Sequence, residues 1–190
     1  KSKKPKLFEY ALKKDIFEIH SFKDWWVAEK MLKRKRIIFR VIGNEKVGMG
    51  HIYRTLSIAH EISDHEILFV CEPEHQIAAT KLAGYDYWLG IFNKKEIITK
   101  IISLKPDLVI NDILMTNQED IIKLKQAGVK TVNFEDLGSG SVLADITINE
   151  LYEKPLFNGE NIFWGHKYFF LRDEFMHAKR QTFLKSVNNL

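Results

Sequence analysis

The sequence lacks the cysteines for a disulfide framework and any hydrophobic run long enough for a membrane helix. Cys71 is the single cysteine among 190 residues, and its place in an apolar run predicts a packing role in a strand. No apolar stretch approaches the roughly 20 residues that span a bilayer, and no signal-peptide pattern is present. Because 45% of the residues are hydrophobic, the chain can bury a good core. We therefore expect a cytoplasmic protein without a membrane partner.

The sequence also lacks a strong excess of charge of one sign. Lys and Arg number 29 against 25 Asp and Glu, which gives a net charge of +4. Much of the excess lies in residues 1–6 and 33–36, and neither cluster comes with an aromatic stacking platform or a nucleic-acid-binding module. The histidines show no compact metal-ligand spacing. We therefore expect no nucleic-acid partner, no metal and no cofactor.

From residue 37 onward, apolar runs alternate with segments of helical periodicity. This alternation predicts an α/β fold, with a Rossmann-like parallel sheet and helices on both faces. We expect strands near 37–42, 66–71, 85–89, 107–111, 129–134 and 145–149, and helices near 51–63, 75–83, 94–104, 117–127 and 173–187.

A glycine-containing loop, residues 43–50, separates the first expected strand from the first helix and is followed by His51. Its glycines permit positive φ and let a ligand approach the main chain, and the free amides of the helix attract anions. The loop matches neither the Gly-Lys-Ser/Thr phosphate loop nor the dinucleotide fingerprint. It is compatible with a phosphate or polar sugar site, and equally with a tight turn in which His51 starts the helix.

Polar residues follow most of the expected strands. In a parallel sheet, ligands collect at the carboxyl ends of the strands, so these side chains should face one crevice. Asp112 is equally compatible with a helix cap, whereas the adjacent carboxylates of Glu135 and Asp136 are suited to hold a sugar or orient a base. The residues expected at the crevice are Gly48 to His51, Glu72, Asn111, Asp112, Glu135, Asp136, Asn149 and Glu150.

Three blocks of sequence, at residues 47–54, 133–149 and 164–175, resemble by their order and spacing the UDP-sugar hydrolases of the pseudaminic acid and spore-coat polysaccharide type. Residues 47–54 read Val-Gly-Met-Gly-His-Ile-Tyr-Arg and are similar to that family's Gly-x-Gly-His-x-x-Arg signature. Residues 133–149 hold Asn-Phe-Glu-Asp-Leu-Gly and a later Ala-Asp-Ile-Thr-Ile-Asn. Residues 164–175 are similar to the family's Gly-Pro-x-Tyr-x-x-Leu-Arg-x-Glu-Phe element, with His166 where proline is common.

The resemblance implies the N-terminal half of a two-domain glycosyltransferase-B (GT-B) fold whose other half holds most of the UDP. It implies hydrolysis of a UDP-activated diacetamido-trideoxy sugar to free sugar and UDP, with His51 as the general base. The role of His51 requires its ring to reach solvent beside the acidic strand ends, and a capping or packing role is the alternative. For Arg54 we favour a salt bridge within the fold over a phosphate contact. The candidate substrate-binding residues are Gly48, Met49, Gly50, Arg54, Asp112, Glu135, Asp136 and Asn149.

Residues 1–36 differ from the rest, and within them the segment 15–30 resembles the end of a CMP-sugar synthetase (cytidylyltransferase) domain, with His20 where that family often has Asp. Ser21 and Asp24 suit a helix N-terminus, and an apolar face follows them. We therefore expect three parts: a cytidylyltransferase tail and linker helix at 1–36, a Rossmann-like domain at 37–178, and a linker helix at 179–190. The partners expected from a fusion protein are an upstream cytidylyltransferase domain and a missing C-terminal nucleotide-binding domain.

Two other functions remain open. One is a GT-B glycosyltransferase, which would pass the sugar to an acceptor instead of water. It remains open because the membrane-associated transferases of peptidoglycan synthesis also have a glycine-rich loop ending in Gly-His at this place. A non-catalytic module would dock on the synthetase or bind a nonulosonic acid precursor.

Overall fold

The computed structural model describes residues 17–171 of the chain. The chain divides into two compact units, Lys1–Arg34 and Lys35–Leu190, and the division lies beside the expected boundary at residue 36. The expected helix at 173–187 and the expected linker at 179–190 lie outside the described residues, as do the first 16 residues of the expected synthetase tail.

Helix α1, Phe22–Lys33, belongs to the first unit. Its N-terminus is capped by Ser21, whose hydroxyl oxygen accepts a hydrogen bond from the amide of Asp24 at 3.2 Å. The Asp24 carboxylate accepts in turn from the Ser21 hydroxyl and from the His20 amide. This reciprocal arrangement satisfies N-terminal donors that no helical carbonyl can reach.

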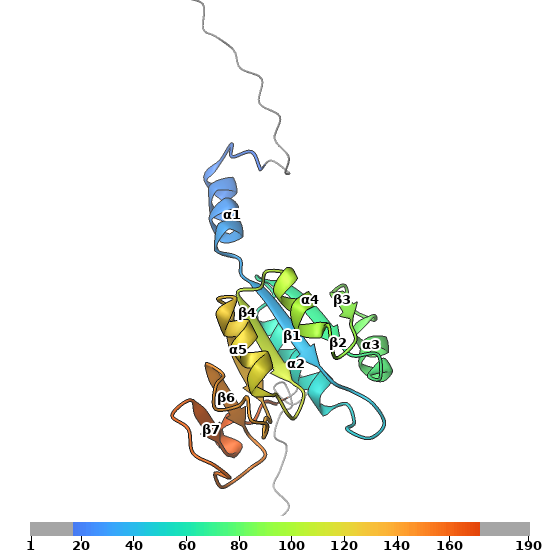
Figure 1. Ribbon diagram of the computed structural model, residues 1–190. Helices are drawn as coiled ribbons and strands as arrows, with labels where there is room; N and C mark the ends of the chain where they lie inside the picture. The colour runs from blue at the N-terminus through green and yellow to red at the C-terminus, as the bar shows by residue number, and fades with distance from the viewer. Residues whose placement is uncertain (1–16, 172–190) are drawn as a thin grey trace, which may run out of the picture. The chain divides into compact units, whose positions relative to one another are not determined.

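The second unit is built on one seven-stranded parallel sheet with the strand order β3-β2-β1-β4-β5-β6-β7 (Figure 1). All six pairs of neighbouring strands are parallel. The strands are β1 (Arg36–Val41), β2 (Glu66–Cys71), β3 (Trp88–Ile91), β4 (Leu108–Asp112), β5 (Lys130–Phe134), β6 (Ile146–Asn149) and β7 (Ile162–Trp164).

Helices cover both faces of this sheet. On one face α2 (Gly50–Glu61) and α3 (Gln76–Leu82) pack on a core that includes Phe39 and Phe69, whose rings stack at 5.0 Å. On the other face α4 (Ile97–Ser103) and α5 (Gln118–Gln126) pack on Ile38, Val70 and Val109. Because successive residues of a strand point to opposite faces, β1 contributes to both cores. Of the helices within residues 17–171, none combines the length and apolar content needed to cross a membrane.

The predicted α/β architecture with a parallel sheet and helices on both faces is confirmed, with two differences in detail. The third strand begins at Trp88, later than the expected 85–89, because Tyr85 and Tyr87 instead pack around the ring of His60. Strand β7 and the short 3-10 helix η1 (His166–Tyr168) were not predicted. Three residues are too few for an alternating pattern to be recognised.

Candidate functional site

The strand order reverses direction between β1 and β4, which lie side by side in the sheet. In β1 the last residue, Val41, is in register with Asp112, the last residue of β4. The loops that follow these two strands run to opposite faces of the sheet and leave a crevice at their carboxyl ends, which is where such folds bind ligands.

The loop at 43–49 is held in one conformation by its own hydrogen bonds. The side-chain oxygen of Asn44 accepts from the amides of Lys46 and Val47, and the amide of Gly48 donates to the carbonyl of Asn44 at 2.9 Å. Gly48 has φ of 76°, a conformation that glycine adopts at little cost. The chain then enters α2 at Gly50, and His51 is the second residue of this helix. No side chain caps the N-terminus of α2.

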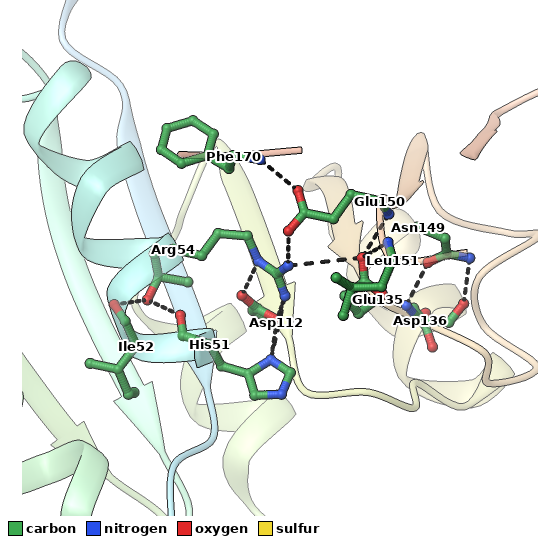
Figure 2. A network of polar contacts seen from close by, with 11 residues as sticks. His51, Ile52, Arg54, Asp112, Glu135, Asp136, Asn149, Glu150, Leu151 and Phe170 are labelled. Carbon is green, nitrogen blue, oxygen red and sulfur yellow. Dashed lines mark hydrogen bonds and ion pairs between the residues drawn. The ribbon is translucent and has the colours of Figure 1, made fainter. Parts of the chain in front are cut away.

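The imidazole of His51 is anchored by one nitrogen. Its Nδ1 lies 2.6 Å from Oδ1 of Asp112. Figure 2 shows the second ring nitrogen on the far edge of the ring, and Nε2 forms no hydrogen bond with another residue of the described chain. The His51 side chain is only 10% exposed, whereas the proposed role as a base requires its ring to reach solvent. The residue nevertheless lines a cavity. Asp112 therefore fixes the ring and leaves Nε2 as the available atom.

Arg54 lies one helical turn after His51 and is surrounded by carboxylates (Figure 2). Its Nε and Nη2 donate to the two oxygens of Asp112 at 2.8 and 2.7 Å, and its Nη1 donates to Oε1 of Glu150 at 2.5 Å. Oε1 of Glu135 lies 3.8 Å from Nη1. All of these side chains are nearly buried, and we call the set His51, Arg54, Asp112, Glu135 and Glu150 the Arg54 cluster.

The charges in the Arg54 cluster are coupled. Burial alone would lower the pKa of Arg54, but the hydrogen bonds and charges of Asp112 and Glu150 outweigh it and raise the pKa far above its usual value. Arg54 is therefore always a cation here. Its donors are engaged within the fold, so the expected salt-bridge role describes its contacts better than a role in binding phosphate.

Glu135 is the member of the cluster with an unusual backbone and an unsatisfied oxygen. It follows β5 with φ of 50°, a left-handed conformation that is uncommon for a residue with a side chain. Its Oε1 accepts from the amides of Glu150 and Leu151, whereas its Oε2 is buried without a partner among the described residues. Burial raises the pKa of Glu135, although the charge of Arg54 and the two amide donors act against the rise.

Asp136, the neighbour of Glu135, points elsewhere and organises loops. Its carboxylate accepts from the amides of Thr116 and Gly138 and from the side chain of Asn133. Its own amide donates to the side-chain oxygen of Asn149 at 2.8 Å. A Cβ on Gly138 would overlap the backbone carbonyl of Thr116, so glycine is needed where these two loops meet. The two adjacent carboxylates therefore do not act as a pair.

A cavity of about 570 Å³ lies beside the Arg54 cluster, a size typical of small-molecule sites. Of the predicted site residues, five line it: Met49, Gly50, His51, Arg54 and Glu135. The other four do not line it, and they are Gly48, Asp112, Asp136 and Asn149. Gly48 shapes the loop and Asp112 lies behind His51 and Arg54.

Several cavity residues were absent from the predicted site. Glu150 was expected at the crevice but was given no role, and it joins Arg54 to the amide of Phe170 through its two oxygens. Leu114, with φ of 69°, and residues 169–171 form apolar walls. Their position in space depends on loop conformation, and the sequence carries no local signal of it.

Two residues expected at the crevice belong to other contacts. Glu72 pairs with the buried Arg40 at 2.9 Å, and Arg40 also contacts Asp120. Asn111 donates to the side chain of Asn133 at 2.9 Å. Arg40 lies in β1 between Phe39 and Val41, so its side chain points to the sheet face opposite α2.

Two curated proteins resemble the chain in sequence. It is 30% identical over 158 residues to an uncharacterized protein of Methanocaldococcus jannaschii, and the aligned region covers 77% of this chain and 33% of that protein. It is 31% identical over 103 residues to UDP-2,4-diacetamido-2,4,6-trideoxy-beta-L-altropyranose hydrolase of Campylobacter jejuni, and this aligned region covers 53% of this chain and 36% of the enzyme. No protein-family model matches the chain. The chain thus spans about a third of the length of these relatives, and one distant relative is a sugar-nucleotide hydrolase.

Proposed function

We propose that this chain supplies the histidine-bearing half of an enzyme that hydrolyses a UDP-linked diacetamido-trideoxy sugar to free sugar and UDP. The observation that carries the proposal is the contact of His51 with Asp112, because it leaves Nε2 of a cavity-lining imidazole without a partner in the described chain. The match to the Campylobacter hydrolase supports the substrate class. In this proposal a second GT-B domain, outside this chain, binds most of the UDP.

In the proposed reaction the oxygen of a water molecule attacks the anomeric carbon of the sugar. Nε2 of His51 takes a proton from that water, and the bond between the anomeric carbon and the diphosphate oxygen breaks with its electron pair leaving on UDP. A histidine has a reference pKa of about 6.5, so it can accept a proton near neutral pH. We infer that the Nδ1–H of His51 donates to Asp112, which fixes the tautomer in which Nε2 is the acceptor.

Asp112 and Arg54 act in this proposal as positioning residues. Asp112 accepts from His51 and twice from Arg54, so its carboxylate cannot turn away from the ring. Nearby, the uncapped amides of α2 offer a positive helix end for the leaving diphosphate.

The proposal is tested with the longer protein that it implies, in which this chain is joined to the proposed second domain, supplied with the UDP-linked diacetamido-trideoxy sugar in water enriched in ¹⁸O. We expect release of UDP and of free sugar in equal amounts, with the heavy oxygen at the anomeric hydroxyl and none in UDP. Heavy oxygen in the UDP would mean attack at phosphorus. Release of UDP only after an acceptor is added would favour the glycosyltransferase alternative.

A further inference from the structure

The carboxylates of the Arg54 cluster oppose the binding of an anion in the part of the cavity beside them. Arg54 is the cation of the Arg54 cluster, and its donors are engaged by Asp112 and Glu150. Three carboxylates surround that single guanidinium at up to 3.8 Å. A diphosphate in the same space would meet negative charge with no free cation from the cluster. The cavity is therefore suited to the uncharged sugar part of a nucleotide-linked ligand.

The walls of the cavity favour a sugar that carries methyl groups. Val47 and Met49 line it from the glycine loop, Leu114 from the loop after β4, and Leu151 from the loop after β6. Residues 169–171 add a further apolar wall. Such walls gain free energy by removing methyl groups from water.

One residue that lines the cavity, Glu135, has a buried acceptor without a donor. Glu135 is 2% exposed, and its Oε2 is buried without a partner within the described part of the chain. The rest of the residue is firmly held, because its amide donates to the carbonyl of Ile148 and its Oε1 accepts two backbone amides. A buried acceptor without a donor costs free energy of folding. Glu135 also has a rare backbone conformation, and residues in such conformations cluster at functional sites.

We propose that Glu135 is a specificity-determining residue that accepts a hydrogen bond from an acetamido N–H of the sugar. The inference rests on the proposed function for the identity of the ligand. An acetamido group matches both features of the site, because its methyl group fits the apolar walls and its N–H supplies the donor that Oε2 lacks. A sugar with an ester in place of the amide keeps the shape but places an acceptor against the carboxylate, which is unfavourable.

The test compares binding of two free sugars to the 190-residue chain by titration calorimetry. One is 2,4-diacetamido-2,4,6-trideoxy-L-altropyranose, and the other has each amide N–H replaced by an ester oxygen. We expect the ester to bind at least about tenfold more weakly to the wild-type chain, a difference of about 1.4 kcal/mol. In Glu135→Gln the difference should shrink to about twofold. The matched control Glu119→Gln, on an 84% exposed side chain of α5, should keep the tenfold difference.

Equal binding of the two sugars to the wild-type chain, or no binding of either, would overturn the inference. A tenfold difference that survives in Glu135→Gln would do the same. If Glu135→Gln fails to fold by circular dichroism, Glu135→Asp replaces it, and the wild-type comparison remains decisive. No step of this assay requires turnover. Selective binding without hydrolysis by the longer protein would remove the proposed reaction alone, and hydrolysis without selective binding would remove the inference alone.

Discussion

Replacing His51 with alanine in the longer protein is expected to lower kcat for UDP release by about 10²- to 10⁴-fold, the usual contribution of a general base. The substitution removes Nε2, the proposed proton acceptor, but leaves Asp112 with both of its hydrogen bonds from Arg54. The fold should therefore survive. Steady-state kinetics on the variant and its circular dichroism spectrum measure the two effects separately.

The matched control is His166→Ala, which removes an imidazole that is 81% exposed and does not line the cavity. It should leave kcat within about twofold of wild type, because exposed substitutions away from a site change little. If His51→Ala turns over as fast as His166→Ala, His51 is not the general base, and its role is the alternative one of capping or packing.

Replacing Arg54 with methionine is expected to destabilise the 190-residue chain by about 3–5 kcal/mol. The substitution removes the cation that compensates Asp112 and Glu150, while methionine still occupies much of the volume. Both carboxylates are 4% exposed or less, so solvation by water compensates little of their charge. Urea denaturation followed by circular dichroism measures the loss. Lys123→Met, which breaks a pair exposed at 56% and 84%, should cost less than about 1 kcal/mol.

The electrostatic cause of this loss can be separated from a packing cause. If uncompensated charge destabilises Arg54→Met, then adding Glu150→Gln should recover part of the stability, because one buried negative charge is removed. If packing around Arg54 dominates, the second substitution should destabilise the chain further. An Arg54→Met variant as stable as Lys123→Met would contradict the account of the Arg54 cluster.

The fold could be predicted from the sequence because its signals are local. The buried strands are continuous apolar runs, as in 66–71, and the helices between them have a clear 3.6-residue period. The rule that ligands collect at the carboxyl ends of parallel strands then brought His51 and Asp112 to one crevice, although they are 61 residues apart. Strand β3 was displaced because tertiary packing of Tyr85 and Tyr87 against His60 decides where that strand begins.

The details of the site depend on long-range contacts and loop conformations, which have no local sequence signal. Glu135 and Asp136 are adjacent and chemically alike, yet the left-handed φ of Glu135 directs one toward Arg54 and the other toward Thr116. The sequence could not reveal that Arg54 is shared by Asp112 and Glu150, since either carboxylate could have been a helix cap or a solvated loop residue. These contacts require the three-dimensional arrangement of β4 and β6.

The central claim is that Asp112 holds His51 in the tautomer whose Nε2 accepts a proton. The most direct measurement is the ¹⁵N spectrum of the His51 side chain in the labelled chain at about pH 8, assigned by comparison with His51→Ala. We expect Nδ1 to be protonated through its contact with Asp112 and Nε2 to be unprotonated, and we expect this preference to weaken in Asp112→Asn. A proton on Nε2 in the wild-type chain would contradict the claim, because that atom could then not act as the base.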